Sequence, residues 1–317
     1  MDVMLLGGLP RSDRARKTLR ALEEGSIGVE EAERTLFEEE ALAIGAQIGA
    51  GLRLVTDPAL SWHDMLRPYA ESWRGVTVDG LARWFDNNFF YRIPVFYSKP
   101  EPSKTILAPR ARTLASKLPR GYSLKVTSIG PLTMVKLSRV EPSVSVDEVL
   151  AEAARIIGDE ARRALDAGAV LVELAEPWLG DIDASVEDAE KLMSLLDHMP
   201  LDRIVLTIYY QPPRDDVWAR LDRVKILHLD YADNPKKALK CLERMCPETL
   251  VLGVLDARNI YLEPRSRVEE AIREARRRCR ESKIILSTSS PLDLIPYVNA
   301  IQKMRHLVEL AEVLNEL

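Results

Sequence analysis

The chain has 317 residues, enough for one large α/β barrel or for two smaller domains, and its net charge is -5 with 29% charged residues of both signs. This balance argues against a nucleic-acid-binding protein, which typically has a concentrated basic face. Residues 1–10 contain no basic leader, and no apolar run is long enough to cross a membrane, so we expect a cytoplasmic protein.

The three cysteines, Cys241, Cys246 and Cys279, fall in segments that we read as helices. An odd, sparse count without close pairing is typical of a reducing compartment, so we expect no structural disulfide. Helices rich in Glu and Arg, such as residues 269–278, also indicate a hot habitat.

Apolar strand candidates alternate with helical stretches along the chain, which predicts a parallel sheet. The candidates are residues 3–6, 52–56, 93–97, 124–129, 170–174, 204–209, 226–229, 250–255 and 284–287. A barrel needs eight strands, so one of these segments belongs elsewhere. We assign 93–97 to a hairpin or an edge, because Pro94 has no backbone N–H to donate.

The pattern of helices is most regular from residue 144 onward. Apolar spacing predicts a helix over 146–167 that ends at Gly168, and the final stretch 296–317 reads as a closing amphipathic helix. We predict one (β/α)8 TIM barrel over residues 1–317, with an open doubly wound sheet as the alternative. The less regular region 36–123 is expected to supply insertions that cap the barrel mouth.

Polar side chains follow five of the predicted strands. They are Thr133, Glu176, Tyr209, Asp230, Asp256, Arg258 and Asn259. Because the carboxyl ends of barrel strands meet at one face, we predict that these residues surround one binding pocket. These residues also have purely structural alternatives: Glu176, before Pro177, as a cap of the next helix, Asp230 as an exposed turn residue, and Asp256 with Arg258 as a local salt bridge.

Two further segments are candidate ligand contacts. Arg11 and Arg16 follow the first strand, and Arg side chains bind carboxylates and phosphates, although a solvated charged helix face is the simpler interpretation. Trp84, Asn87 and Asn88 combine an aromatic surface with amides, which suits a loop that binds a heterocycle.

Metal chemistry finds little support in the sequence. His63, His198, His228 and His306 are scattered, and none has a Cys or His at ligand spacing, so we predict no metal site. His228, on a predicted buried strand, is interpreted as a core histidine. The chain also has no nucleophile elbow, phosphate-binding glycine loop or dinucleotide fingerprint, and we assign no catalytic residue.

Several motifs together resemble the cobalamin-independent methionine synthase family. They are Gly8-Leu-Pro-Arg-Ser-Asp-Arg-Ala-Arg16, Trp84-Phe-Asp-Asn-Asn88, Gly130-Pro-Leu-Thr133, Val172-Glu-Leu-Ala-Glu-Pro177, Thr207-Ile-Tyr209, Asp256-Ala-Arg-Asn-Ile-Tyr261 and Ser287-Thr-Ser-Ser290. The matches run in order through nearly the whole chain and are most similar to the amino-terminal barrel of that two-barrel family.

The resemblance implies a zinc-free barrel, because Ile208 and Tyr209 stand where the catalytic barrel has its His-x-Cys pair. It also implies that Arg16 and Asn88 contact a folate ligand. Leu19 replaces an expected lysine, and Ala175 replaces the Asp of the Asp-Glu-Pro motif. No cofactor bound by this chain is expected apart from a methyl donor, methyltetrahydrofolate or methylcobalamin, as ligand.

Three functions follow as hypotheses. The first is a methyl-donor-binding barrel that transfers methyl groups to homocysteine with a separate zinc-bearing chain, since zinc lowers the pKa of the attacking thiol. The second is a self-sufficient methyltransferase of the same superfamily. The third is a non-catalytic structural subunit.

Overall fold

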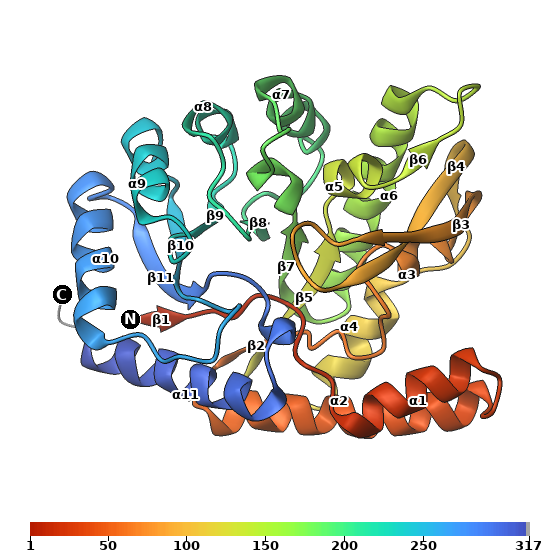
Figure 1. Cartoon of the computed structure of the whole chain (residues 1–317), viewed down its shortest axis with the longest axis horizontal. Helices are drawn as coiled ribbons and strands as arrows, with labels where there is room; N and C mark the ends of the chain where they lie inside the picture. Colours follow the sequence, from red (N-terminus) through yellow and green to blue (C-terminus); the bar gives the residue numbers. More distant parts are fainter. Residues whose placement is uncertain (315–317) are drawn as a thin grey trace.

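The computed structural model describes residues 1–314 and has eight parallel strands in one sheet, in the order β1-β11-β10-β9-β8-β7-β5-β2 (Figure 1). The strands are β1 (Asp2–Val3), β2 (Leu54–Thr56), β5 (Ser123–Ile129), β7 (Ala169–Ala175), β8 (Ile204–Ile208), β9 (Ile226–Asp230), β10 (Thr249–Leu255) and β11 (Lys283–Thr288). The predicted (β/α)8 barrel is confirmed, and the doubly wound alternative is wrong.

The barrel closes between its two end strands, β1 and β2, at their carboxyl ends. Gly8 N–H donates to the Asp57 carbonyl (3.2 Å), and Leu9 N–H donates to the Pro58 carbonyl (3.0 Å). Both bonds join the loops that follow the strands, while β1 itself pairs only with β11 among the described strands. The sheet is therefore a nearly closed cylinder whose closing contacts lie at the mouth.

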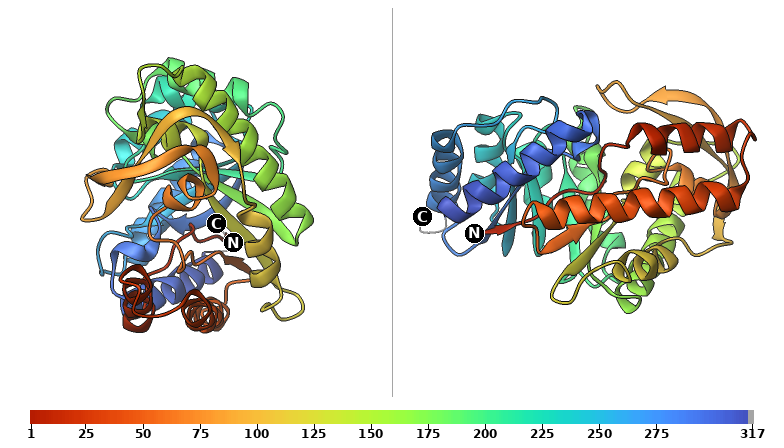
Figure 2. Two further views of the ribbon diagram at one scale, coloured as in Figure 1. Left: turned by 90° about the vertical axis from the view of Figure 1, so that its right-hand side faces the viewer. Right: turned by 90° about the horizontal axis from the view of Figure 1, so that it is seen from below.

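Helices surround the barrel (Figure 2). They are α1 (Asp13–Glu23), α2 (Val29–Gly49), α4 (Leu107–Ala115), α5 (Pro131–Lys136), α6 (Val146–Asp166), α7 (Val186–Leu195), α8 (Asp215–Trp218), α9 (Pro235–Arg244), α10 (Arg265–Arg278) and α11 (Tyr297–Val313), with 3-10 turns η1 (Pro177–Gly180), η2 (Ala219–Leu221) and η3 (Leu292–Leu294). Among the described residues we find no helix that is both long and apolar enough to span a bilayer.

Local sequence signals account for several helix ends. Ser145 caps α6 by accepting a hydrogen bond from Glu148 N–H, and Gly168 follows the helix with φ +112, which L-residues with side chains rarely adopt. Ser185 and Asp188 form a reciprocal capping box at the start of α7. The expected final helix is present as α11, and residues 315–317 lie outside the described residues.

An inserted hairpin lies between β2 and β5 in sequence and covers one side of the mouth. Strands β3 (Trp73–Arg83) and β4 (Phe90–Pro102) form an antiparallel hairpin, β6 (Arg139–Val140) adds to β4, and the short helix α3 (Arg67–Ala70) precedes β3. Strand β4 packs against α6, and Figure 1 shows the hairpin on the same side of the molecule as α5 and α6. The segment 93–97 therefore lies in a hairpin outside the barrel, and the expected capping insertion is confirmed.

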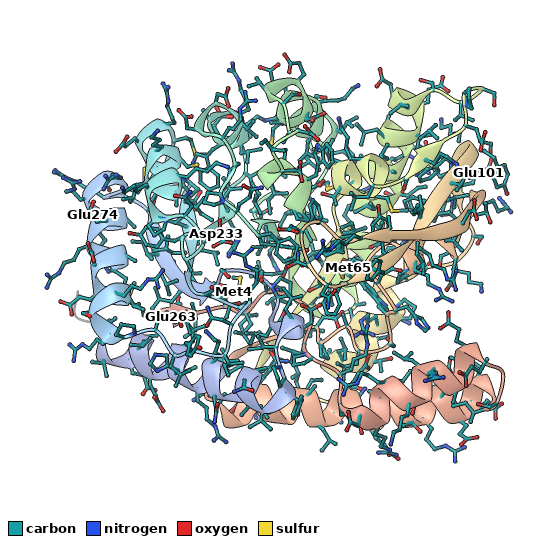
Figure 3. The ribbon with its side chains drawn as sticks, in the orientation of Figure 1. Met4, Met65, Glu101, Asp233, Glu263 and Glu274 are labelled. Carbon is teal, nitrogen blue, oxygen red and sulfur yellow. A yellow bond between two sulfur atoms is a disulfide. The ribbon has the colours of Figure 1, made fainter. Side chains whose placement is uncertain are left out.

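The barrel interior is apolar near the amino ends of the strands and polar near their carboxyl ends. Met4, Val205, Val251 and Ile285 pack together in the apolar layer; Met4 is labelled in Figure 3. Lys125, Glu173, Thr207 and His228 belong to the polar layer, and all are buried. TIM-barrel interiors are mostly filled by branched apolar residues, so a buried polar layer beneath the mouth indicates a functional site.

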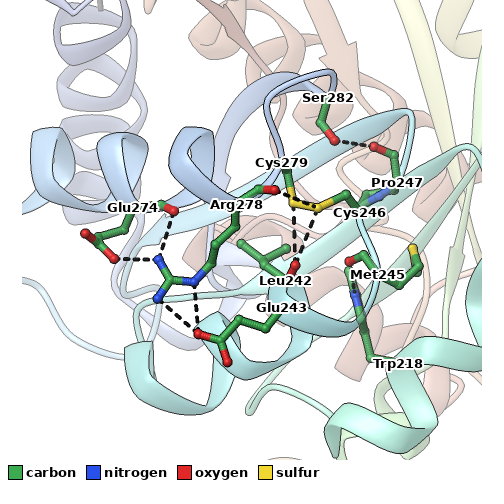
Figure 4. Close-up of a disulfide and its surroundings, with 10 residues drawn as sticks. All are labelled: Trp218, Leu242, Glu243, Met245, Cys246, Pro247, Glu274, Arg278, Cys279 and Ser282. Atoms are coloured by element: carbon green, nitrogen blue, oxygen red, sulfur yellow. Dashed lines mark hydrogen bonds and ion pairs between the residues drawn. A yellow bond between two sulfur atoms is a disulfide. The ribbon is translucent and has the colours of Figure 1, made fainter.

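A disulfide joins Cys246 and Cys279, so the expectation of no structural disulfide is wrong (Figure 4). The two residues are 33 positions apart in sequence, but each lies shortly before one of the adjacent parallel strands β10 and β11. Strand pairing brings their Cα atoms to 5.4 Å, within disulfide range. Cys241 remains a free, buried thiol.

Candidate functional site

A pocket of about 80 Å³ opens at the carboxyl-terminal mouth of the barrel. The glycines after β1, the loop 58–65 after β2, and the hairpin residues 84 and 89–91 form its walls. Thr127 and Glu173 reach it from inside the barrel, and Asp293 reaches it from the loop after β11. Met65, labelled in Figure 3, also lines it. Binding sites of TIM barrels lie at this face.

Aromatic side chains from separate elements enclose the pocket. The lining rings are Trp62, Trp84, Phe89, Phe90, Tyr91, Tyr209 and Tyr210. Trp84 Nε1 donates to the Tyr210 hydroxyl (2.9 Å), which links the hairpin to the loop after β8. Phe85 and Tyr210 have φ values of 49° and 76°, and their rings lie 5.8 Å apart. Left-handed backbone at non-glycine residues is costly and clusters at functional sites, so these two residues add to the case for this wall as a candidate site.

Glu173 forms the floor of the pocket with a buried ion pair beneath it. Its Oε2 accepts from Gly7 N–H (2.9 Å) and from Lys125 Nζ, and its Oε1 accepts from the Thr207 hydroxyl (3.3 Å). Lys125 Nζ also donates to the Thr56 hydroxyl (2.7 Å). These contacts fix the carboxylate of Glu173 in one position at the end of the barrel axis.

Two buried polar atoms at the pocket have no hydrogen-bond partner among the described residues. They are Thr127 Oγ1 and Asp293 Oδ1. Burial raises the pKa of the Asp293 carboxyl to about 6, although the charge of Arg11 opposes this change. Buried polar groups are normally satisfied, so these atoms indicate where a polar ligand or water binds.

Arg11, Trp84 and Tyr209, three of the predicted contacts, do line this pocket. Arg11 Nε donates to the Leu60 carbonyl (3.0 Å), and its Nη2 donates to the Trp62 carbonyl, so this side chain also shapes the loop 58–65. Burial lowers the pKa of Arg11, while the nearby Asp293 raises it.

A second pocket of about 250 Å³ adjoins the first across Tyr209 and Tyr210. Asn87 and Arg258, both predicted contacts, line this second pocket. Arg258 pairs with Asp233, which Figure 3 labels. The mouth therefore has two chambers, and five of the predicted residues line one or both of them: Arg11, Trp84, Asn87, Tyr209 and Arg258.

The loop after β10 is held by its own hydrogen bonds. Asp256 accepts from Arg258 N–H (2.9 Å) and from Asn259 Nδ2 (2.7 Å), while Asp256 N–H donates to Glu263 (2.8 Å). The buried Lys303 of α11 lies 3.3 Å from Glu263 Oε2. Asp256, Arg258 and Asn259 therefore stabilise the loop, as the structural alternative anticipated, and Asp256 and Asn259 are not among the residues that line either chamber.

Asp230 and Glu176 are fully buried rather than exposed. Asp230 Oδ2 has no hydrogen-bond partner among the described residues, and burial raises the pKa of its carboxyl well above the ordinary value. The reading of Asp230 as an exposed turn residue is wrong. Glu176 accepts from the N–H groups of Leu132 and Thr133 and from the Thr133 hydroxyl (2.6 Å), so it caps the start of α5. Its side chain makes no cap bond to the turn η1 that follows it, so the alternative that it caps the next helix is wrong.

Arg16 and Asn88 lie outside both chambers. Arg16 is on the exposed face of α1, where it pairs with Asp13, and Asn88 is exposed in the turn of the hairpin. Thr133 and Glu176 likewise bond to each other and do not line either chamber. The structure therefore brings together only part of the predicted set, and the ligand contacts of the remaining residues stay predictions.

The zinc implied for the wider family does not fit the residues of this chain. Within residues 1–314, no group of three or more His, Cys, Asp or Glu side chains is arranged to hold a metal ion. Cys246 and Cys279 are bonded to each other, and Cys241 Sγ contacts the Pro213 carbonyl (3.3 Å). His228 lies between the carbonyls of Ile208 and Thr288, with its pKa lowered by burial to about 4, as expected for a core histidine.

Sequence reasoning missed Glu173, Lys125 and Asp293. Glu173 and Lys125 interrupt the apolar strands β7 and β5, and each has the alternation that points a side chain into the barrel. A charged residue within an apolar strand could therefore have indicated a polar barrel interior. Asp293 offered none, because only the folded loop after β11 brings it toward Arg11 and Gly8.

The fold and the mouth pocket define a (β/α)8 barrel with a pocket at its carboxyl face. Residues 67–280 match the family described as cobalamin-independent synthase, N-terminal domain. This match covers more than half of the chain, which therefore belongs to that family and confirms the resemblance seen in the sequence.

Relatives and solved structures agree with this assignment. The chain is 23% identical to a methionine synthase of Sulfurisphaera tokodaii, over 100% of this chain and 93% of the relative. It is 23% identical to a methionine synthase of Sulfolobus acidocaldarius, over 98% and 91%. These relatives fit the expected hot habitat.

Two solved structures share the fold. A putative vitamin-B12 independent methionine synthase from Listeria monocytogenes has a TM-score of 0.77 at 16% identity, with 99% of this chain and 97% of that chain covered. A B12-independent methionine synthase from Shewanella sp., in complex with selenomethionine, has a TM-score of 0.76 at 17% identity, with 92% and 90% covered.

Proposed function

We propose that this chain is the methyl-donor-binding barrel of a homocysteine S-methyltransferase and works in the cytoplasm with a separate zinc-bearing chain. The observation that carries the proposal is the mouth pocket, in which Arg11, Trp84 and Tyr209 surround a floor formed by Glu173. Membership of the family supports methyl transfer as the reaction class. Asn87 and Arg258 in the second chamber extend the donor site.

The side chains present indicate which part of the reaction this chain would perform and which part the zinc-bearing chain would perform. The described residues offer no cluster that would hold zinc, so a partner must supply the thiolate of homocysteine. This chain would supply aromatic surfaces, the fixed Glu173 carboxylate and exclusion of water. Positioning two reactants in a dry site is a major source of rate enhancement, so such a role is chemically sufficient.

Isotope transfer tests the proposal. Labelled methyltetrahydrofolate or methylcobalamin is incubated with homocysteine and this chain, the zinc-bearing chain, or both. We expect labelled methionine only when both proteins are present. Equal activity of the partner alone contradicts the proposal, and full activity of this chain alone supports a self-sufficient enzyme, an alternative favoured by relatives of matching length.

Variants at the mouth locate the activity. Trp84→Leu removes an aromatic wall and its bond to Tyr210, and we expect kcat/KM to fall about tenfold or more. Arg155→Met changes an exposed residue of α6 outside both chambers and serves as the control. A selective loss in Arg16→Met with polyglutamylated folate would restore the tail-binding role that the resemblance implies.

A further inference from the structure

The first pocket has an acidic lining in addition to its aromatic walls. Asp64, Glu173 and Asp293 reach it, whereas Arg11 is the only Lys or Arg among the described residues that line it. Burial lowers the pKa of His63, which therefore lines the pocket as a neutral ring near pH 7. Lys125, which does not line the pocket, neutralises the charge of Glu173 through their buried ion pair. The wall seen by a ligand thus carries negative charge.

The carboxylates of the pocket differ in how far the protein satisfies them. Asp64 accepts three backbone N–H bonds, from Leu66, Arg67 and Arg92. Asp293 is different, because its buried Oδ1 has no partner within residues 1–314, and Arg11 directs two of its nitrogens to backbone carbonyls instead. An unpaired carboxylate oxygen beside aromatic rings is a binding point for a cation.

We propose that the mouth pocket binds a small organic cation, an ammonium or sulfonium group, between Asp293 and the aromatic side chains of Trp84, Tyr209 and Tyr210. Ring faces attract such groups by their quadrupole, and this attraction is strongest where water is excluded. The free space of about 80 Å³ suits a head group of a few heavy atoms, so only such a group of a larger ligand enters this pocket and the rest of the ligand lies outside it.

The unpaired Thr127 hydroxyl adds a further polar contact at the barrel end of the pocket, which a protonated amine satisfies and a methylated onium group does not. The raised pKa of Asp293, about 6, agrees with a cation site, because a bound cation would offset the cost of ionising this buried carboxyl.

The inference rests on the proposed function, because the cationic group would belong to a ligand of the same mouth pocket.

Calorimetry with matched probes tests this inference. Choline is compared with its neutral carbon isostere, in which a tert-butyl group replaces the trimethylammonium group. The second pair is n-butylammonium and butanol. Trimethylsulfonium represents the sulfonium class and is compared with the same carbon isostere as choline. We expect at least one cation to bind about tenfold more tightly than its neutral match. Preference for choline or trimethylsulfonium identifies an onium ligand, and preference for butylammonium identifies a protonated amine. Equal binding of all pairs, or no binding, overturns the inference.

Variants separate the pocket from general surface charge. Asp293→Asn keeps the shape of the side chain, and we expect it to abolish most of the preference for the cation. Glu101→Gln removes an exposed carboxylate of β4, labelled in Figure 3, and should leave the preference unchanged. If Asp293→Asn fails to fold, Trp84→Leu must lower the affinity for the cation; an unchanged preference in the folded variant contradicts the inference.

The result is independent of the transfer assay. Methyl transfer from folate or methylcobalamin without any cation binding leaves the proposed function intact and removes the inference. Cation binding without methyl transfer, whether this chain is assayed alone or with the zinc-bearing chain, supports the inference and contradicts the proposed function.

Discussion

At the scale of single residues, the Lys125–Glu173 pair is the least expected feature of the barrel interior. Both side chains are essentially unexposed. Burying an ion pair costs desolvation free energy that the attraction between the charges only partly offsets, so such pairs are weak sources of stability. The pair lies directly under the pocket, where it holds the Glu173 carboxylate in place, and this position fits the proposed role in ligand binding.

Removing one partner of this pair should be costly. Lys125→Met leaves the Glu173 carboxylate buried without its cation, and we expect the free energy of unfolding to fall by about 3–5 kcal/mol. Denaturant titration measures this change. The double variant Lys125→Met/Glu173→Leu should recover most of the loss, and Arg74→Met, which breaks an exposed pair with Glu101, should cost less than about 1 kcal/mol. A single-variant cost as small as that of Arg74→Met would contradict this account.

Asp293 should make stability depend on pH. Its folded pKa of about 6 lies above the ordinary value of 3.8, so between these values the folded chain holds a proton that the unfolded chain has released. Stability contributed by the protonated form is therefore complete below about pH 4 and is lost as pH rises to about 6. The charged groups and phenols facing it are Arg11, Tyr209 and Tyr210.

The matching variant removes this dependence. Asp293→Asn should be more stable than the wild type at pH 7 by about 1–3 kcal/mol, and the difference should disappear near pH 4. Thermal unfolding at several pH values measures both. Parallel curves for the two proteins over this range would show that the carboxyl is not held in a desolvated position.

At the scale of elements, the hairpin β3–β4 and the helix pair α1–α2 have separate roles. The hairpin supplies Trp84 and Tyr91 to the pocket. Helix α1 packs on α2 and is joined to it by ion pairs of Arg14 with Glu38 and Glu39, and none of its basic residues is among those that line the pocket. The insertion, and not the basic helix, therefore completes the site.

The disulfide between the segments before β10 and β11 should stabilise this side of the barrel. Closing a loop of 33 residues in the unfolded chain corresponds to roughly 3–4 kcal/mol in the chain-entropy description. We expect Cys246→Ser to lower the Tm, and a reductant to lower the Tm of the wild type but not of the variant. Cys241→Ser, which changes the free thiol, tests whether any cysteine substitution has the same effect. Intracellular disulfides are a known feature of proteins from hyperthermophiles, so this bond is compatible with a cytoplasmic chain.

At the scale of the whole molecule, the first strand β1 pairs with the last strand β11, and the contacts that close the barrel lie at the face that carries the pocket. The bonds from Gly8 and Leu9 to the loop after β2 close the cylinder at the mouth. The Gly7–Gly8 turn also donates to Glu173, and Gly8 has φ +94, a conformation that suits glycine. Closure of the barrel and assembly of the pocket floor thus depend on the same few residues.

Most of the architecture could be predicted from the chain, because alternation of apolar strands and amphipathic helices is written in local periodicity. The candidate site was predictable only in part. Residues that end a strand, such as Tyr209, were found because strand ends converge in any barrel. Arg16 and Asn88 lie close in sequence to the pocket residues Arg11 and Trp84, but both are exposed to solvent.

Sequence by itself determined the family, the barrel and the face at which the pocket lies, since these follow from motifs and repeating patterns along the chain. Only the tertiary structure decided that Glu173 pairs with Lys125, that Asp293 faces the aromatic wall, and that Cys246 meets Cys279. The physical reason is that each of these contacts joins segments far apart in sequence, and their distances are set by strand pairing and loop packing.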